Sequence, residues 1–456
     1  MRDGAYKSFP DVDLSEEYDL VVVGGGISGL SAAYFFRKAL GADKKVLILD
    51  NHDDFGGHAK RNEFRDERQG GKLHLGYGGT MLISTPFPYS FVARALIEDE
   101  LRIPVSRYDE YVDWGVYKGL ERAMFFDRET FGDDRLVVGQ GKLPWPEFFE
   151  KACLSDQAKK DLTRLYTEKK DYMPGLSAEE KRNKLARMSY QDFLVNLVGV
   201  TPEAMPFFRS MVFRNAMHID TAPAVHVATH HMPGFDGMGL ELEPGFEEDS
   251  YQFHFPDGNA TIARLLVQRL VPDAIPGKHD PQSIVLEKAD YAKLDEEGKD
   301  VRIRLNSTVI RVEHEGPLDE ARSLRVAYVR GGKPRGVRAK HVVLACYNMV
   351  IPYLVPDLPE AQKKALHYPA KVPLMYTNVF LRNWKAFEKL GFSSFSAPGM
   401  YYSSGMLDFP VSIGGYDCPK KPDEPIVVHM VRYPTTPGLP RKQQNRAGMH
   451  LSLIHI

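Results

Sequence analysis

The stretch YDLVVVGGGISGLSAAYF, residues 18–35, joins an apolar strand to a glycine-rich turn and then to a helix-like segment. Leu20–Val23 is a strand-length apolar run, and apolar residues recur at helical spacing after the turn. Between the two, Gly24, Gly26 and Gly29 fit the pattern G-x-G-x-x-G. This order predicts a βαβ unit whose helix N-terminus binds the phosphates of a dinucleotide.

Glycine is expected at each position of the pattern for a different physical reason. Gly24 permits the tight turn, Gly26 lets the backbone approach a pyrophosphate, and Gly29 lets helix and strand pack closely. Ser28 lies in the same turn. A second strand, KVLILD, ends at Asp50, about 20 residues further on, where a carboxylate is expected to accept a hydrogen bond from a ribose hydroxyl. The alternative is an ordinary βαβ unit with a glycine-rich turn and no ligand.

Composition excludes several classes of function. The formal charge is −2, from 59 basic and 61 acidic residues, so nothing favours nucleic acid as a partner. The cysteines, Cys153, Cys346 and Cys418, form no CxxC pattern, and no metal site is predicted. The longest apolar runs are strand-length, so no membrane span is expected, and the polar N-terminus contains no signal core. As written, the chain is predicted to be cytoplasmic.

The residues after Asp50 extend the motif. Five residues separate Asp50 from the pair Gly56–Gly57. Here the sequence resembles the glutathione-reductase-type FAD family and, within it, the FAD-dependent amine oxidase superfamily. In that family an acid, five residues and a Gly-Gly pair continue the fingerprint, which implies FAD and not NAD. Where relatives often have arginine, this chain has His58, and Lys60 and Arg61 close behind are expected to offset phosphate charge.

The resemblance implies further cofactor contacts and a domain order. Gly78 and Gly79 are expected near the flavin ring, the backbone of Val309 at the adenine end, and Ala345 where a strand returns to the cofactor. The implied fold is α/β: a glutathione-reductase-type, Rossmann-like FAD-binding domain interrupted by a mixed α+β substrate domain. The expected boundaries are 18–85 for the first FAD-binding segment, 86–250 for the substrate or cap region, 251–350 for the second FAD-binding segment, and 351–456 for the return to the substrate region.

Within the superfamily, the chain most resembles the spermidine dehydrogenase group. The resemblance rests on segments such as GYGGTMLISTPFPYS, RAMFFDRETFG and YPAKVPLMYTNVFLRNW. It implies oxidation of a carbon–nitrogen bond of a polyamine such as spermidine, with hydride passing to FAD. It also raises a non-covalent haem b as a second cofactor, with no spacing that singles out a ligand. The conceivable haem ligands are His218, His226, His230, His231 and His254.

Catalysis requires a neutral amine held beside the flavin. Many amine oxidases place a lysine, through water, against flavin N5, and Lys371 is the candidate here. An aromatic pocket would lower the pKa of the amine and attract distal ammonium groups. The available aromatic residues are Tyr77, Phe87, Tyr89, Tyr108, Tyr111, Trp114, Phe253 and Tyr376.

The two ends of the chain qualify this interpretation. No segment after Val428 resembles the closing strand and helix of the family, so the chain is expected to recognise the ADP half of FAD and to hold the flavin ring weakly. If an export leader precedes the parent protein, as in some relatives, the protein is periplasmic. The electron acceptor, the oxidised bond and the oligomeric state stay open. The alternatives are a flavin-dependent polyene desaturase or isomerase of the phytoene desaturase type, and a non-catalytic dinucleotide-binding module.

Overall fold

The first strand of the motif lies inside a six-stranded sheet. The computed structural model describes residues 8–83, 89–209, 211, 217–242, 253–369, 371, 373–434, 436–440, 442–444 and 446–447. The sheet contains, in spatial order, β7 (Val301–Arg304), β2 (Val46–Leu49), β1 (Glu17–Val23), β10 (Lys333–Leu344), β9 (Leu324–Arg330) and β8 (Ser307–His314). β7, β2, β1 and the C-terminal part of β10 pair in parallel. The N-terminal part of β10 pairs antiparallel with β9, and β9 pairs antiparallel with β8. The predicted strands are confirmed.

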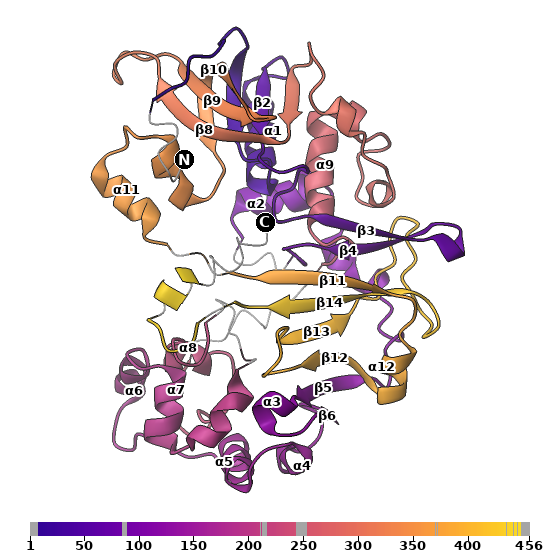
Figure 1. Ribbon diagram of the computed structural model, residues 1–456, viewed down its shortest axis with the longest axis vertical. Helices are drawn as coiled ribbons and strands as arrows, with labels where there is room; N and C mark the ends of the chain where they lie inside the picture. The colour runs from indigo at the N-terminus through magenta and orange to yellow at the C-terminus, as the bar shows by residue number, and fades with distance from the viewer. Residues whose placement is uncertain are drawn as a thin grey trace.

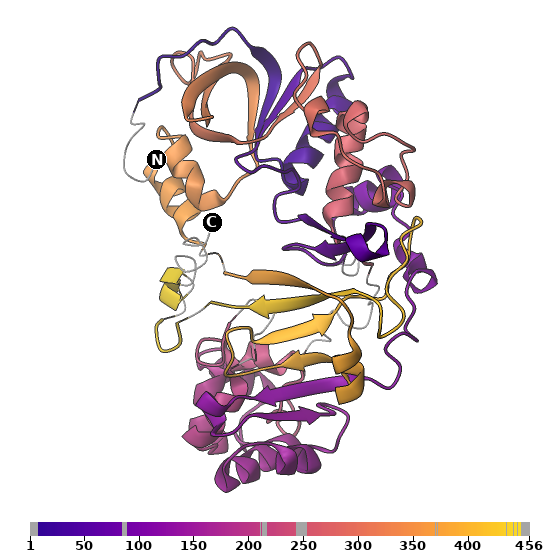
Figure 2. The ribbon, with the colours of Figure 1, turned by 45° about the vertical axis from the view of Figure 1, so that its right-hand side comes forward.

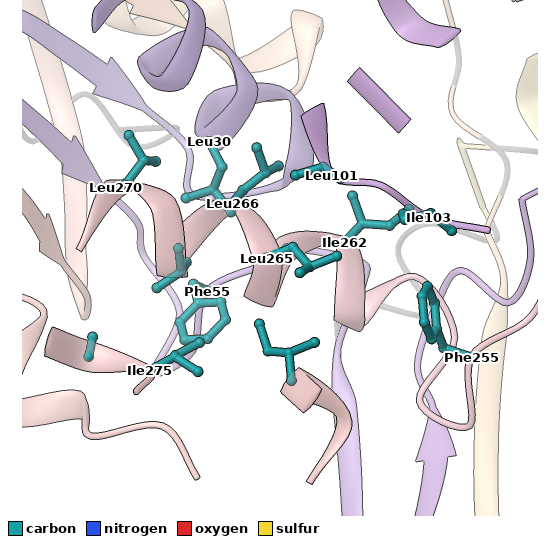
Figure 3. Packing of buried hydrophobic residues seen from close by; sticks show 14 of the residues in the cluster. Leu30, Phe55, Leu101, Ile103, Phe255, Ile262, Leu265, Leu266, Leu270 and Ile275 are labelled. Atoms are coloured by element: carbon teal, nitrogen blue, oxygen red, sulfur yellow. The ribbon is translucent and has the colours of Figure 1, made fainter. Parts of the chain in front are cut away.

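The side chains of β1 alternate between two apolar clusters, because successive residues of a strand point to opposite faces. Leu20 and Val22 join the cluster formed with the helices α1 (Ile27–Leu40) and α9 (Ala260–Leu270). Figure 3 shows part of this cluster, with Leu30 of α1 close to Leu266 of α9. Nearly every residue of α9 is buried, so this helix is a core element and not a surface helix.

The opposite face of β1 is covered by the antiparallel strands of the same sheet. Val21 and Val23 pack in a cluster with Val309 of β8, Tyr328 of β9 and Leu354 of α10 (Ile351–Leu354). In Figure 2 the strands β8–β10 curl over this face. The short parallel strands are therefore buried on both sides, which explains why they read as continuous apolar runs.

A second six-stranded sheet forms the other half of the molecule (Figure 1). Its spatial order is β11 (Met375–Leu381), β14 (Ile426–Arg432), β13 (Ser404–Leu407), β12 (Phe392–Ser396), β5 (Glu121–Phe126) and β6 (Arg135–Val138). Helices gather beyond β5 and β6 around a separate apolar cluster. They are α3 (Arg128–Phe131), α4 (Trp145–Lys151), α5 (Asp156–Thr167), α6 (Ala178–Leu185), α7 (Tyr190–Asp192) and α8 (Ala224–Ala228).

The hairpin of β3 (Arg61–Asp66) and β4 (Lys72–Tyr77) lies between the two sheets. It closely follows the second glycine pair, and β4 lies against β14. The remaining helices are α2 (Phe91–Ala95), α11 (Glu360–His367) and α12 (Lys385–Leu390). Among the described residues, none of the helices combines the length and the apolar character needed to cross a bilayer.

Candidate nucleotide-binding site

The turn between β1 and α1 requires glycine at two of its three motif positions. Gly24 has a φ of +112°, and a Cβ added there would lie 2.4 Å from the carbonyl oxygen of Ala345. A Cβ on Gly29 would lie 1.9 Å from the carbonyl oxygen of Gly24. Both clashes are with backbone atoms that cannot rotate away. Ala345, the residue that follows β10, therefore packs directly against the turn, and its contact with the cofactor stays a prediction.

The N-terminus of α1 is free to receive an anion. Its N-cap, Gly26, offers no side chain to cap the first turn, and that turn contains no acidic residue. The first N–H groups of a helix have no partner within the helix, and the helix dipole is positive at this end. Ser28 is exposed in the same turn. These features suit the diphosphate of a dinucleotide.

The second glycine pair packs directly against the first turn. Gly56 forms a parallel bridge with Gly26 and donates its N–H to the carbonyl of Gly25 at 2.9 Å. Gly57 has a φ of +60°, and a Cβ there would approach the Cα of Gly26 to 3.2 Å. A Cβ on Gly26 would make only ordinary van der Waals contact, with the Gly56 carbonyl oxygen and the Gly57 Cα at 3.9 Å, so this position accommodates a methyl group without a clash. The two turns thus form a cradle of bare backbone, which fits a pyrophosphate.

Asp50 stands at the end of β2 with 4% of its surface exposed. Its Oδ2 accepts a hydrogen bond from the Gly25 N–H at 2.6 Å. Its Oδ1 accepts one from the His52 N–H at 2.8 Å, and His52 Nδ1 lies 3.0 Å away. A carboxylate has about four lone-pair sites, so a ribose hydroxyl can still be accommodated. The sequence predicted Asp50 at the end of this strand, but it did not predict that the Asp50 carboxylate also stabilises the glycine turn by accepting the Gly25 N–H.

His58, Gly78 and Gly79 lie together beside the glycine pair. A Cβ on Gly79 would meet the carbonyl oxygen of His58 at 3.1 Å, and Gly78 is similarly close to Lys60. His58 Nε2 lies 2.5 Å from the hydroxyl of Tyr347. Desolvation lowers the pKa of His58, and the neighbouring His52 and Lys371 lower it further.

Lys371 reaches the same neighbourhood from the other half of the chain. Its side chain is exposed, and its Nζ lies 5.5 Å from the centre of the Tyr347 ring. Tyr347 therefore connects Lys371 to His58. Val309 lies apart from this group, in β8, where it packs against the apolar face of the parallel strands. The cofactor roles of these residues stay predictions.

The two cations that follow the glycine pair are used differently from the expectation. Arg61 donates to Oδ2 of the buried Asp257 at 2.8 Å and to Glu63 at 2.7 Å. Lys60 pairs with Asp53 at 3.0 Å on the surface. Arg61 therefore joins the hairpin to the segment that begins α9. The contact between Arg61 and Asp257 could not be predicted from the sequence, because the two residues are far apart along the chain.

A buried polar group adjoins the end of β4, and sequence reasoning missed it. Asn378 of β11 donates from Nδ2 to the carbonyl of Tyr77 at 2.8 Å. Its Oδ1 lies 2.6 Å from Nδ1 of His429 in β14. His429 Nε2 lies 2.7 Å from Oδ1 of Asp408. No spacing in the sequence predicts this group, because its members come from four separate segments.

The expected aromatic residues fall into two sets. Tyr77 and Tyr376 meet edge to face, with ring centres 5.8 Å apart. Phe253 contacts Tyr108 and Tyr111, with ring centres 5.6 and 6.2 Å apart. Trp114 and Tyr89 are largely at the surface. Phe87 lies outside the described residues.

The conceivable haem ligands do not form one group. The rings of His226 and His230 lie 4.7 Å apart in and beside α8. His254 lies far along the chain, against Tyr77 and Phe409. In the portion of the chain that the structure describes, no three His, Cys, Asp or Glu side chains gather as a metal site. A haem can be held by one or two ligands, so haem b stays a prediction.

Comparison with known proteins supports the nucleotide domain. Residues 22–96 match the model of the NAD(P)-binding Rossmann-like domain. Oxidoreductase PigB of Serratia sp. is 43% identical over 83 residues, which are 18% of this chain and 11% of that protein. The probable flavin-containing monoamine oxidase A of Dictyostelium discoideum is 43% identical over 53 residues, 12% of this chain and 11% of that protein. The matches thus cover about a tenth of each relative.

The fold extends beyond this domain. A solved structure of putrescine oxidase, a variant redesigned in its cofactor binding, superposes with a TM-score of 0.51 and 16% identity. The match covers 96% of this chain and 81% of that one. At this identity the likeness concerns the fold alone. The chain therefore has a mixed α/β fold that contains a Rossmann-like NAD(P)-binding domain and resembles the fold of putrescine oxidase.

Proposed function

We propose that this chain is an FAD-dependent oxidoreductase that oxidises a carbon–nitrogen bond of an amine, with a polyamine such as spermidine as its substrate. The observation that carries the proposal is the cradle of bare backbone formed by Gly26 and Gly57 at the uncapped start of α1. Its residues fit the diphosphate of FAD, and Asp50 lies where the ribose would be held. FAD, when bound, supplies the hydride-accepting chemistry.

The protein's own contribution is to bind, orient and shield. The glycine turns would hold the diphosphate, and Gly78 and Gly79, which lie against Lys60 and His58, would approach the flavin ring. Aromatic surroundings such as Tyr77 and Tyr376 disfavour a charged amine, so they keep the reacting nitrogen neutral. We assign Lys371 to hold a water molecule on the ring side of the cofactor, which its exposed position beside Tyr347 permits.

The test is anaerobic mixing of the FAD-loaded protein with amines. Spermidine, spermine and putrescine should bleach the visible flavin absorption, and Gly26→Ala should remove the response because it fills the cradle. Bleaching by a polyene and not by amines would instead establish the desaturase or isomerase alternative. Adenine nucleotide binding without any flavin reduction would leave a binding module. A Soret band in the purified protein would decide whether haem b is a second cofactor.

Lys371 has its own prediction. Lys371→Met should slow flavin reduction by the amine about a hundredfold or more, the range expected for loss of one general acid–base group. FAD affinity should stay unchanged, because the aromatic contact of Lys371 is with Tyr347 and not with the glycine turns. Stopped-flow absorbance separates the two quantities. An equal rate in the variant would remove Lys371 from the proposed mechanism.

A further inference from the structure

We propose that Asp408, His429 and Asn378, here called the His429 unit, hold one buried proton and position the segment Tyr77–Gly79 for the ring end of the dinucleotide. The three residues are positioning residues, since none lies in the glycine cradle. The contact of this segment with the ring end of the dinucleotide rests on the proposed function. The positioning of Tyr77–Gly79 by the unit does not depend on that function, and it is tested separately.

The hydrogen-bond directions within the unit follow from chemistry. The Nδ2 of Asn378 faces the carbonyl of Tyr77, which can only accept, so the amide is fixed with Nδ2 as donor. Its Oδ1 therefore faces His429 Nδ1 as an acceptor, at 2.6 Å. Consequently Nδ1 of His429 carries a hydrogen. The opposite amide orientation would place two acceptors against each other.

A second proton lies on the other side of the imidazole. His429 Nε2 and Asp408 Oδ1 are 2.7 Å apart, which requires one hydrogen between them. Either His429 is an imidazolium beside a carboxylate, or Asp408 is protonated beside a neutral ring, and both states are neutral overall. Asp408 Oδ1 also accepts the N–H of Phe409 at 2.9 Å. Desolvation raises the pKa of the Asp408 carboxyl, while His429 opposes the shift, as expected for a shared proton.

Two members of the unit are sealed from solvent, and the third, Asn378, is half-buried. His429 is 1% exposed and Asp408 is 4% exposed. The ring of Tyr77 stacks on His429, with ring centres 4.0 Å apart and planes inclined by 25°. The edge of His254 lies against the same tyrosine, with ring centres 5.3 Å apart. Water is therefore kept from the contact of His429 with Asp408, where a broken hydrogen bond leaves an unpaired buried polar group.

Strand pairing alone does not require these side chains. Asn378 and His429 already face each other across the β11–β14 ladder, whose backbone bonds need no particular side chain. A buried ionisable pair costs desolvation, and apolar residues of similar volume often serve stability equally well. What the unit adds is a directional bond from the second sheet to the carbonyl of Tyr77, the last residue of β4.

That bond controls a segment with little freedom. A Cβ on Gly76 would lie 3.2 Å from Asn378 Nδ2, so the amide packs on the strand itself. Two residues further, the N–H of Gly78 donates to the carbonyl of Lys60 at 2.7 Å. Gly79 then lies against His58, next to the glycine pair. Movement of Asn378 is therefore transmitted to the backbone beside the cradle.

The first test needs no cofactor. Hydrogen–deuterium exchange of a peptide containing Tyr77–Gly79 should accelerate about tenfold in Asn378→Ala, because the loss of one hydrogen bond is worth about that factor. His429→Phe keeps a ring stacked on Tyr77 and should produce the same acceleration. The matched control is Val428→Ala, which lies on the opposite face of β14 with Trp384 and Leu407. It should lower the melting temperature and leave this exchange unchanged.

The second test uses FAD and ADP as probes of the whole chain. Asn378→Ala should weaken FAD about tenfold and shift its visible band, while ADP affinity stays equal to that of the wild type. Unchanged exchange in both variants, or equal losses of FAD and ADP affinity, would overturn the positioning role. If the wild-type chain binds ADP and not FAD, the proposed function fails, and the exchange result still decides whether the unit positions Tyr77–Gly79.

Discussion

Gly26 and Gly29 stand three residues apart in one turn, yet an added methyl group would meet different surroundings at each. At Gly29 it would lie 1.9 Å from the carbonyl oxygen of Gly24 and 3.1 Å from the side chain of Val22. At Gly26 the nearest atoms are 3.9 Å away, and the backbone φ of −71° suits any residue. The fold therefore requires glycine at position 29 and does not require it at position 26.

This difference gives the first prediction. Gly29→Ala should lower the free energy of unfolding by several kcal/mol, since overpacking against backbone forces the strand and helix apart. Gly26→Ala should leave the unfolding free energy nearly unchanged and weaken ADP and FAD binding by at least about tenfold. Urea denaturation and nucleotide titration measure the two effects. If Gly26→Ala binds both nucleotides normally, the cradle is not the phosphate site.

His254 gives a prediction about acid sensitivity. It is 1% exposed, and desolvation, aided by His429, lowers its pKa from 6.5 to about 3 against a smaller opposing effect of the Phe255 backbone. Between these values the unfolded chain binds a proton that the folded chain excludes. Stability from this residue is therefore complete above pH 6.5 and falls by up to roughly 1.4 kcal/mol per pH unit as the pH drops toward 3.

His254→Phe should flatten the stability curve in this range. Urea denaturation between about pH 4 and pH 7 measures how the free energy of unfolding changes with pH. The contribution of His254 to this slope corresponds to uptake of about one proton on unfolding in the wild type, and the variant lacks it. Phe255→Leu is the matched control, because Phe255 is the neighbouring buried residue without a titratable group. It should lower stability equally at every pH. Equal slopes in wild type and His254→Phe would show that His254 titrates normally.

At the scale of elements, the buried pair of Arg61 and Asp257 joins β3 to the N-terminus of α9. Asp257 is fully buried and accepts hydrogen bonds from Arg61 and from Thr261 Oγ1, at 2.8 and 2.6 Å. The helix and the hairpin come from distant stretches of the sequence, so this contact fixes the hairpin that follows the glycine pair. Removing one partner leaves a buried charge with fewer contacts.

We therefore predict that Asp257→Ala lowers the free energy of unfolding by about 3 kcal/mol. Asp257→Asn should cost less, because the amide oxygen still accepts from Arg61. Asp53→Ala is the control: it breaks the exposed pair with Lys60, which is worth little, and should change stability hardly at all. Chemical denaturation measures all three. Similar costs for Asp257→Ala and Asp53→Ala would contradict the role of the buried pair.

The features that the sequence predicted correctly depend on interactions between residues close together in the chain, and those it missed depend on interactions between distant residues. The strands around Gly24 and Asp50, and the need for glycine at Gly29, follow from local periodicity and backbone sterics, and the structure confirms them. The Asp257 contact and the His429 unit depend on strands paired across the whole chain. A histidine in an apolar strand looks the same in sequence whether it is a structural residue or a positioning residue. Only the tertiary pairing distinguishes the two.

At the scale of the whole molecule, the apolar core divides into distinct clusters, and the cluster of the nucleotide half also takes in Val411, Ile413, Tyr416 and Cys418 from between β13 and β14. One pair of clusters packs on the two faces of the nucleotide sheet. The others lie among the helices beyond β5 and around Trp384 beside the second sheet. The glycine cradle belongs entirely to the first half. The hairpin β3–β4 and the hydrogen bond from Asn378 to Tyr77 link the halves.

Distinct clusters predict two unfolding transitions, only one of which responds to nucleotide. Two of the three tryptophans, Trp145 and Trp384, pack in the clusters of the second half, whereas Trp114 contacts Tyr108 beside the cluster of the nucleotide half. Trp145 packs against Phe149 and Tyr166 among the helices, Trp384 packs against Tyr117, and Trp114 is exposed. Tryptophan fluorescence therefore follows mainly the second half, whereas far-ultraviolet circular dichroism follows both.

ADP at about a hundred times its dissociation constant should stabilise the nucleotide half by about 2.7 kcal/mol. The circular dichroism curve should then shift in one transition, while the tryptophan curve stays at its original temperature. Gly26→Ala should abolish the shift, because its methyl group occupies the space over the turn. A tryptophan transition that moves with ADP by the same amount would mean that the links through Tyr77 make the two halves unfold as one. In that case the His429 unit would transmit nucleotide binding to the second sheet.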